Sequence, residues 1–402
     1  MTPPAGIVLG RLDLAAVHPI SPESCVDAHY CEGAAQLQLG SGFFRPESRP
    51  SRDLGVLLAR HLAEAGPLRL LDGMAGCGIR ALRYGLEAGA AAVWANDADP
   101  ERLPLLEANL APLRQRSCAL RVTARTVQQL LADCLLRQER FELVDLDAFG
   151  CPAALLPLAL EAVAFDGVLY LASTDGRSPT GHDRAAAIRR LGAAARAHPA
   201  SWELALRLQL GSVARAAWAL GRGVEPLVSF SEGRTFRTAV RLRRRAAVGE
   251  ERQLGLLAHC HGCGDQQVQS LLQLRRWAPC SCGGAGEPPL AVSGPLWIGA
   301  LQHRPTLEAL SRQAAASPGS LDGGAARLLA ALLTDDGLPA RCWPVAAIGR
   351  SLGGGPPRLA ALVAALRQRG YQASASAVMA AQLRSDAPWP EILATARSVA
   401  AK

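Results

Sequence analysis

Short apolar runs alternate with segments of helical periodicity between residues 51 and 243. The runs predict strands at 68–72, 93–97, 120–123, 141–147, 168–172, 227–230 and 238–243. Apolar residues at helical spacing predict helices at 51–62, 79–86, 101–113 and 127–131. This alternation predicts a mostly parallel, doubly wound α/β sheet, and in the strand at 238–243 it places the arginines on one exposed face.

The stretch from Leu68 to Pro100 has the pattern of half a mononucleotide-binding βαβ unit. Its first strand ends at Asp72, a glycine-rich turn with Gly76 and Gly78 follows, and its second strand ends at Asp97. Glycine lets the backbone approach a ligand closely, and the helix N-terminus after the turn favours anionic groups. Asp97 lies nineteen positions after Gly78, close to the distance that places an acid over a ribose hydroxyl. The pattern favours a Rossmann-like site for a nucleoside-type cofactor over an ordinary tight βα connection.

A change of composition near residues 246–252 predicts a boundary between one domain at 1–248 and a smaller one at 249–402. Past this boundary the cysteines cluster, and glycine and proline pairs occur at 283–284 and 288–289. Three helices are predicted farther on, at 325–333, 346–352 and 358–369, and they resemble a small winged-helix-like domain. We therefore expect a second, α+β domain after the α/β sheet.

The chain of 402 residues carries a formal net charge of +8, and Lys402 is its only lysine. Arginine suits phosphate contacts, so this charge favours an acidic partner, nucleic acid first, over a basic protein with no such partner. Eleven cysteines without a recognisable secretory signal indicate a reducing compartment. The most apolar run, Ala153 to Ala172, contains Glu161 and Asp166 and predicts a helix and a strand rather than a membrane span. We expect a soluble intracellular protein.

The strand at 141–147 ends in the sequence Asp145-Leu-Asp147-Ala-Phe149-Gly150. Ligands of such sheets lie at the carboxyl ends of the strands, and this strand is expected beside the cofactor strand. An acid and backbone carbonyls there accept both hydrogens of an exocyclic amine, so that the nitrogen lone pair can attack an electrophilic methyl group. Phe149 is placed to stack on a base. The alternative is a helix-capping Asp147 with Phe149 in the core.

Two pairs of cysteines, Cys260 with Cys263 and Cys280 with Cys282, are separated by sixteen residues. Four thiolates in two close pairs match a closed, tetrahedral structural zinc site. The second pair is C-x-C rather than the more usual C-x₂-C, and the histidines at 259 and 261 are alternative ligands for one position. Disulfides are disfavoured by the reducing compartment, and unligated thiols seldom pair so regularly.

With these stretches in view, the chain resembles the tRNA (guanine(26)-N2)-dimethyltransferase family nearly from end to end. Its entry segments look like the family's F-Y-N-P and N-R-D motifs, its turn matches the cofactor loop, and its later acids match the second-strand acid, D-L-D-P-F-G-x-P and T-D motifs. The segments that carry the likeness are Gly42-Phe43-Phe44-Arg45-Pro46, Ser51-Arg52-Asp53, Asp72 to Arg80, Asn96-Asp97, Asp145 to Pro152, Ser173-Thr174-Asp175, the four cysteines and Gly294-Pro295-Leu296-Trp297.

The resemblance implies methyl transfer from S-adenosylmethionine to the exocyclic N2 of a guanine in tRNA. It implies that Arg52, Arg80 and Asp97 hold this cofactor. The second expected cofactor is the Zn²⁺ at the four cysteines. We expect a cytoplasmic monomer that binds tRNA and no membrane. The fold class is thus a Rossmann-like methyltransferase sheet with a zinc-containing C-terminal domain.

For the target base, the resemblance implies that Asp147 holds the guanine amine, with Phe43 and Phe149 on either side of the ring. Asp145 is the second candidate for the acceptor, because residues two apart in a strand share one face. Two other functions stay open. One is an RNA-binding relative without catalysis, and the other is a nicotinamide-dependent oxidoreductase built on the same glycine turn.

Three departures from the family pattern bear on these functions. Ala148 replaces the proline of the acceptor loop, and Arg125-Thr126 stand about where an acid near the adenine is expected. Residues 375–377 replace a late R-T-H element. The first two departures are the best sequence evidence for a relative without catalysis.

Overall fold

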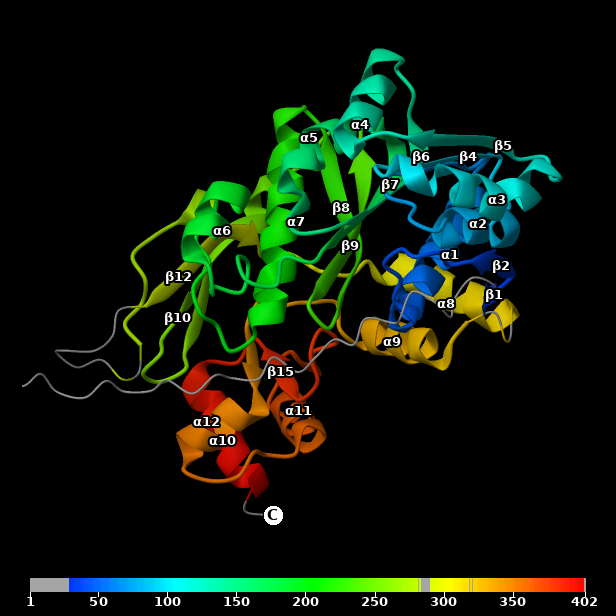
Figure 1. Ribbon diagram of the computed structural model, residues 1–402. Coiled ribbons are helices and arrows are strands. Elements are labelled where there is room, and N and C mark those ends of the chain that lie inside the picture. Colours follow the sequence, from blue (N-terminus) through cyan, green and yellow to red (C-terminus); the bar gives the residue numbers. More distant parts are fainter. Residues whose placement is uncertain (1–28, 281, 283–289, 318, 320, 401–402) are drawn as a thin grey trace, which may run out of the picture.

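The computed structural model describes residues 29–280, 282, 290–317, 319 and 321–400. Within these residues a seven-stranded sheet with helices on both faces adjoins a three-stranded antiparallel sheet, and a terminal lobe follows (Figure 1). The first 28 residues and the glycine and proline pairs at 283–284 and 288–289 lie outside the described part of the chain. No helix within the described ranges is long and apolar enough to cross a membrane.

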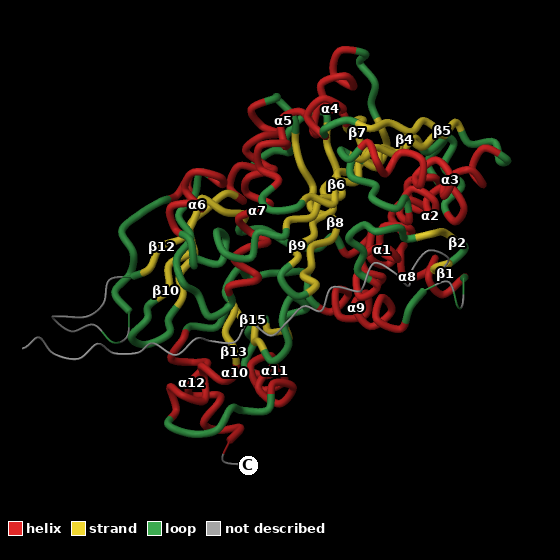
Figure 2. The backbone as a smooth tube through the Cα atoms, in the orientation of Figure 1, coloured by secondary structure: helices red, strands yellow, loops and turns green. Residues whose placement is uncertain are grey.

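The central sheet has the strand order β5-β4-β3-β6-β7-β9-β8. Strands β5, β4, β3, β6 and β7 are parallel to one another, and β9 and β8 are antiparallel. Figure 2 shows β9 and β8 beside the parallel strands. The strands are β3 (Arg69–Asp72), β4 (Ala92–Asp97), β5 (Ala119–Ala124), β6 (Phe141–Ala148), β7 (Val163–Ser173), β8 (Gly223–Glu232) and β9 (Thr235–Arg243). The predicted mostly parallel, doubly wound α/β class is confirmed, and so is the position of the acceptor strand β6 beside the cofactor strand β3.

Both faces of this sheet are buried, because successive side chains of each strand enter different cores. Leu70 and Leu143 belong to one core, whereas their neighbours Leu71 and Val144 belong to the other. The first face is covered by α1 (Arg49–Ala63), α2 (Ile79–Glu87) and α3 (Leu103–Arg114). The second face is covered by α4 (Val127–Leu136), α5 (Leu156–Ala162) and α7 (Ser201–Ala219).

The prediction that the arginines of β9 lie on an exposed face is wrong. Arg241 and Arg243 are half-buried on the first face, where the end of α1 with His61 and Leu62 lies nearby. Both guanidinium groups pair with Glu225, at 3.1 and 2.9 Å. The alternation along the strand is as predicted, but the arginines on the face that it defines pair with Glu225 and are only partly exposed.

Several shorter elements surround the sheet. A hairpin of β1 (His29–Glu32) and β2 (Ala35–Gln38) packs on α2 and α3, and α6 (Arg184–Leu191) precedes α7. The 3-10 helices are η1 (Pro46–Ser48), η2 (Pro100–Arg102), η3 (Pro152–Leu155), η4 (Glu250–Gln253) and η5 (Leu271–Gln273).

The second sheet has the order β11-β10-β12 and packs on α7. Its strands are β10 (Leu254–His259), β11 (Gln266–Ser270) and β12 (Ala291–Trp297). Gly211 of α7 makes this close approach possible, because a Cβ there would lie 2.9 Å from the Cα of Leu296. The second sheet therefore packs directly against α7, a helix that covers the large sheet.

After β12, helices α8 (Arg304–Ala316) and α9 (Gly323–Thr334) return to pack beside α1 (Figure 1). Their Leu307, Leu310, Leu329 and Leu332 join the core of the first face. The chain then forms a terminal lobe with its own core. The lobe consists of β13 (Cys342–Pro344), α10 (Val345–Leu352), α11 (Leu359–Gln368), β14 (Ala373–Ala375), β15 (Gln382–Ser385) and α12 (Trp389–Ala400).

The three predicted C-terminal helices exist as α9, α10 and α11, but their grouping needs correction. Leucines of α9 are buried against the first face of the large sheet, and α12 is the third helix of the lobe instead. Periodicity along the chain identifies a helix, but it does not say which core receives its apolar side. The boundary predicted between residues 248 and 249 stays a prediction.

Candidate active site and metal centre

The turn between β3 and α2 presents an open cradle. Gly76 has a φ of +56°, and a Cβ there would meet nothing within 4 Å. Gly78 has a φ of +84° at the start of α2, and a Cβ there would come within 2.8 Å of the Leu106 side chain. A side chain is therefore strained at both positions, and at Gly76 the space above the turn remains available to a ligand.

Two acids border this turn. Asp72, at the end of β3, is fully buried, and neither of its carboxylate oxygens has a hydrogen-bond partner among the described residues. Asp97, at the end of β4, accepts hydrogen bonds from the backbone N–H of Gly76 at 2.9 Å and of Asp99 at 3.0 Å. Asp97 thus fixes the turn from the neighbouring strand. A buried acid without a partner and a half-buried acid beside an open glycine turn fit a polar cofactor.

The two acids of β6 share one face, as the alternation predicts, and a cluster of arginines meets them there. Arg80 of α2 lies 3.5 Å from Asp145 Oδ2 and 3.3 Å from Asp147 Oδ2. Arg237 of β9 lies 2.8 Å from the same Asp147 oxygen. Asp145 also accepts a 2.6 Å hydrogen bond from the Tyr84 hydroxyl. The structure brings Asp72, Asp145, Asp147 and Arg80 together, and it adds Arg237.

The three carboxyl groups differ in their electrostatic surroundings. Burial raises the pKa of Asp72, and the nearby charge of Asp145 raises it further. Burial also raises the pKa of Asp145, against the attraction of Arg80 and Arg237. Burial would raise the pKa of Asp147 as well, but the charges of Arg237 and Arg80 outweigh it and hold this pKa below its usual range. Asp147 is therefore the acid that stays ionised.

The loop after Asp147 is held by the next strand. The Thr174 hydroxyl accepts a 2.7 Å hydrogen bond from the Gly150 N–H. The Gly150 carbonyl accepts from the Ser173 hydroxyl at 2.9 Å and from the Thr174 N–H at 3.1 Å. These three bonds restrain the loop at Gly150, so the rigidity that a proline at position 148 would supply has another source.

Phe43 and Phe149 meet above this loop and are both largely exposed, at 66% and 73%. Their ring centroids lie 5.5 Å apart in an edge-to-face arrangement. The alternative in which Phe149 is a core residue is therefore excluded. A flat base can enter between the two rings once they separate, and both faces of a base would then be covered.

Arg52 lies outside this cluster, and its guanidinium is already hydrogen-bonded to other groups of the protein. It donates to both carboxylate oxygens of Glu32, at 2.8 and 2.6 Å, and to the carbonyls of Arg45 and Pro46. These bonds use four of the five N–H groups of a guanidinium. Arg52 therefore fixes the segment that follows Phe43, and its assignment to the cofactor stays a prediction.

The residues at the expected adenine side are also in contact with other groups. Arg125 lies 2.9 Å from Asp133 of α4, and Thr126 caps that helix in a capping box with Gln129. The Asn96 side chain donates to the carbonyls of Gly73 and Arg125, at 3.1 and 2.9 Å. This edge of the cradle is thus built from backbone carbonyls and an amide.

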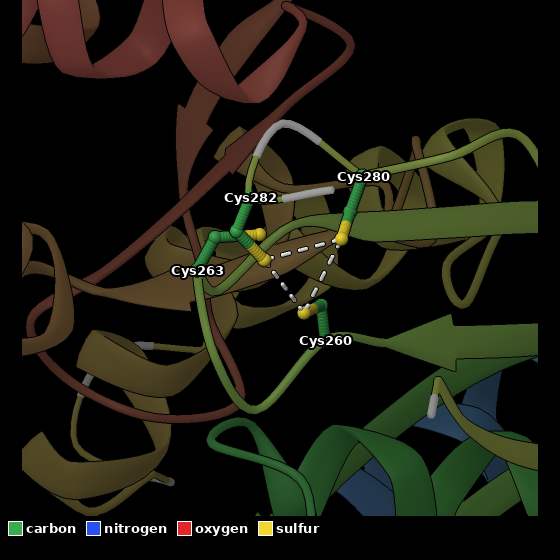
Figure 3. A group of neighbouring side chains, drawn as sticks. All are labelled: Cys260, Cys263, Cys280 and Cys282. Carbon is green, nitrogen blue, oxygen red and sulfur yellow. Dashed lines mark hydrogen bonds between the residues drawn. The ribbon is translucent and has the colours of Figure 1, made fainter. Parts of the chain in front are cut away.

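The four predicted cysteines come together beyond the end of β10 (Figure 3). Their sulfur atoms all lie within 4.8 Å of one another, and Cys260, Cys280 and Cys282 are separated by 3.2 to 3.6 Å. A tetrahedral Zn²⁺ with bonds of about 2.3 Å spaces its sulfurs by about 3.8 Å. The geometry fits four thiolate ligands. The ring of His259 faces those of His198 and His261 instead, with ring centroids 5.2 and 4.9 Å away.

Arg237 is the site residue that the sequence did not reveal. The available signal was the alternation in β9, where Arg237 has the same parity as Arg241 and Arg243. The prediction that this face is exposed concealed the position of Arg237 beside the carboxyl end of β6.

Comparison with known proteins bears on the family and the fold of this chain. A family model described as TRM, N2,N2-dimethylguanosine tRNA methyltransferase, matches residues 35–397. The tRNA (guanine(26)-N(2))-dimethyltransferase of Methanosphaerula palustris is 31% identical over 355 residues, which cover 88% of this chain and 90% of that protein. The enzyme of the same name from Methanoregula boonei is 32% identical over 355 residues, covering 87% and 88%.

A solved structure described as the complex of Trm1 from Pyrococcus horikoshii with S-adenosyl-L-methionine has the same fold. Its TM-score is 0.79 at 24% identity, over 92% of this chain and 99% of that chain. The resemblance noted from the motifs is confirmed at the level of sequence and of fold. With a family model that spans most of the chain and relatives above 30% identity over most of its length, the chain belongs to the N2,N2-dimethylguanosine tRNA methyltransferase family.

Proposed function

We propose that this protein transfers methyl groups from S-adenosylmethionine to the exocyclic N2 of guanine 26 in tRNA. The observation that carries the proposal is the position of Asp147. It is an ionised acid at the carboxyl end of β6, beside the cofactor strand, below two exposed aromatic rings. The names of the family and of its relatives supply the substrate.

S-adenosylmethionine supplies an electrophilic methyl group when it is bound. We assign its binding to Asp72, Gly76, Gly78 and Asp97, which form the open cradle of the glycine turn. Arg80 lies at the junction between this cradle and the acceptor, because its guanidinium reaches Asp145 and Asp147. Fixed groups at both sides of the transfer position supply orientation, which is most of what such a reaction requires.

The chain's own residues position the amine. Asp147 accepts hydrogen bonds from N2–H, which localises the nitrogen lone pair and stabilises the positive charge that develops on nitrogen. Phe43 and Phe149 hold the base between their rings after they separate. Asp145 is buried and accepts a hydrogen bond from the Tyr84 hydroxyl, which ties the strand that carries Asp147 to α2.

The direct test is methyl transfer to unmodified tRNA, followed by mass spectrometry of the nucleosides. We expect N2-methyl- and N2,N2-dimethylguanosine at position 26. Calorimetry should show binding of S-adenosylmethionine and none of NAD, because the family match disfavours an oxidoreductase. Cofactor binding without methyl transfer would instead identify a relative that binds RNA and has lost catalysis.

The second sheet and the terminal lobe are proposed to bind tRNA around a structural Zn²⁺ held by Cys260, Cys263, Cys280 and Cys282. The enzyme is proposed to act as a cytoplasmic monomer. Changing any of the four cysteines to serine should remove one equivalent of zinc and destabilise residues after 250, because a closed thiolate site contributes to folding directly. Metal analysis and thermal melting measure both effects. A fully stable, metal-free protein would contradict the assignment.

A further inference from the structure

The pairing of Asp147 with Arg237 crosses an intervening strand. In the register of the sheet, Asp147 of β6 stands opposite Ala172 of β7, and Ala172 stands opposite Arg237 of β9. The three residues form one row on one face. Adjacent strands lie about 4.8 Å apart, so the backbones of β6 and β9 are about 10 Å apart at this row. The small side chain of Ala172 leaves the space that Arg237 crosses.

A second arginine reaches the same acid from the helix above. The closest contacts of Arg80 and Arg237 with Asp147 both involve Oδ2, at 3.3 and 2.8 Å. The two guanidinium groups also lie over the ring of Tyr170, at 5.9 and 5.5 Å from its centroid. Both arginine side chains are almost completely buried, whereas 34% of the Asp147 side chain is exposed. Asp147 is thus held from behind and open in front.

We propose that Arg237, together with Arg80, is a positioning residue that keeps Asp147 ionised and oriented, so that Asp147 acts as a permanent anionic acceptor and never as the base that stores the substrate proton. This inference rests on the proposed methyl transfer. We call the pair of Arg80 and Arg237 the arginine clamp.

The surroundings of Asp147 favour its charged form. Arg80 from α2 and Arg237 from β9 supply two positive charges, and the opposing acids are Asp145 on β6 and Asp72 on β3. Tyr84 and Tyr170 also face the cluster, and burial raises the pKa of both hydroxyls. Glu232 at the end of β8 lies 3.9 Å from Arg237, and burial raises its pKa too. The net effect keeps the pKa of Asp147 low, because both arginines approach it most closely.

The clamp has a consequence for the chemistry. As the bond from N2 to the methyl carbon forms, the bond from that carbon to sulfur breaks and its electron pair stays on sulfur. The nitrogen becomes positively charged and must lose one proton. A carboxyl group whose pKa is held down does not retain this proton at neutral pH, so the proton ends on bulk water, which can reach the exposed side of Asp147. Asp147 is therefore ionised before transfer and again after it.

The first experiment observes Asp147 without cofactor or tRNA. Protein labelled at the aspartate side-chain carbonyl carbons is titrated by NMR, and the Asp147 signal is identified by its loss in Asp147→Asn. In the unaltered protein this signal should stay at its ionised position to the lowest pH at which the fold persists. In Arg237→Gln it should titrate at least about one pH unit higher, since an opposite charge at this distance lowers a carboxyl pKa by roughly 1–3 units.

The second experiment measures single-turnover methyl transfer against pH. With Arg237→Gln the rate should fall on the acid side, at the pH where Asp147 becomes protonated, and recover as pH rises. Arg237→Lys keeps a positive charge but lacks the planar fork, so it should restore the pH profile with a lower maximal rate. Arg241→Gln is the matched control on the same strand. Arg241 pairs with Glu225 and lies four residues farther along β9 than Arg237. Its pH profile should not change.

Thermal melting establishes that each variant is folded. If Arg237→Gln does not fold, the titration of the unaltered protein and of Arg237→Lys still decides the question. An Asp147 signal that titrates near the ordinary value of about 3.9 in the unaltered protein would overturn the clamp. So would an identical titration in a folded Arg237→Gln. Absence of methyl transfer at every pH would contradict the proposed function, while the titration would still test the clamp.

Discussion

The described part of the chain holds several buried clusters of arginines and carboxylates, and two of them are built in opposite ways. One is the active-site cluster of Asp72, Asp145, Asp147, Arg80 and Arg237. The other, which we call the junction cluster, joins α7 to the C-terminal segments through Glu203, Arg207, Asp335 and Arg384. The side chains of the junction cluster are all at least 97% buried. Removing such charges from water carries a desolvation cost that their partners must offset.

The junction cluster is fully satisfied. Arg384 donates to both oxygens of Asp335 at 2.7 and 3.1 Å, and to both oxygens of Glu203 at 2.5 and 2.7 Å. Arg207 donates to Glu203 at 2.8 Å and to the carbonyls of Trp297, Gly299 and Gly337. Side chains and carbonyls from four parts of the chain therefore share one network.

The active-site cluster is not satisfied. Among the described residues, buried atoms without a hydrogen-bond partner include both oxygens of Asp72, one oxygen of Asp145, one nitrogen of Arg80 and two of Arg237. Such groups are costly unless something else binds them. The difference teaches how to separate structure from function in buried charges. In the proposed function, the closed network serves the fold, whereas the open one is completed by the cofactor and the target base.

The largest effect is expected in the junction cluster. Arg384→Met should lower the free energy of unfolding by about 3–5 kcal/mol, because Asp335 would stay buried without its cationic partner and Glu203 would keep only Arg207. Denaturant unfolding measures the loss, and single-turnover methyl transfer by the folded variant should be retained. The control is Arg369→Met, since Arg369 and Glu391 form a solvent-exposed pair whose loss should cost under about 1 kcal/mol. Equal losses in both variants would show that the junction cluster stabilises the fold no more than an exposed ion pair does.

The same variant should change the acid stability. Burial would raise the pKa of Glu203, but the charges of Arg384 and Arg207 lower it to about 2. A lowered pKa in the folded state stabilises the protein above the unfolded value of about 4.3, and this stabilisation is lost as pH falls toward 2. Without Arg384 the folded pKa rises, so acid unfolding should begin at a higher pH. Circular dichroism against pH checks the direction.

The next effect concerns the acceptor of the open cluster. Asp147→Asn should lower the single-turnover rate by about 10²–10³-fold at saturating cofactor, because a fixed charge opposite the reacting nitrogen is removed. The affinity for S-adenosylmethionine and the melting temperature should change little. Asp145→Asn is the comparison, and its smaller effect is expected because Asp145 is fully buried, whereas part of the Asp147 side chain is exposed where a base can approach. A collapse of the rate only in Asp145→Asn would move the acceptor role there.

A smaller effect is expected at the cofactor cradle. Asp97→Ala should weaken the binding of S-adenosylmethionine by roughly 1.5–3 kcal/mol, since a charge-assisted contact to the ribose would be lost. The bond that Asp97 makes to Gly76 would be lost as well. Calorimetry measures the affinity. An unchanged affinity would show that Asp97 only supports the turn.

The smallest effect is expected at the loop after the acceptor. Thr174→Val removes the acceptor of the Gly150 N–H, a neutral contact worth about 0.5–1.5 kcal/mol. We expect the rate to fall by no more than about 10-fold, with stability nearly unchanged. Combining it with Ala148→Pro tests the idea that Thr174 supplies the rigidity missing at position 148. If proline does not recover the rate of Thr174→Val, that idea fails.

Much of the site follows from local sequence. Each of these local features is defined by residues that are close together in the sequence. They are the glycine turn with Asp72, the strand-end acids Asp97 and Asp147, and the paired cysteines. Periodicity places an acid at the end of a strand, and parallel strands bring their carboxyl ends to one edge. These features are therefore visible without the fold.

Tertiary structure alone decided the partners of these residues. Arg237 reaches Asp147 because three strands align in register and Ala172 is small, and no pattern along the chain encodes that row. Arg52 is taken up by Glu32, and α9 packs on α1 rather than with α10. By itself the sequence determined the elements, the strand-end chemistry and the family. The choice of which buried charges are satisfied and which stay open depended on contacts between distant segments, because long side chains pair with whatever the packing places within their reach.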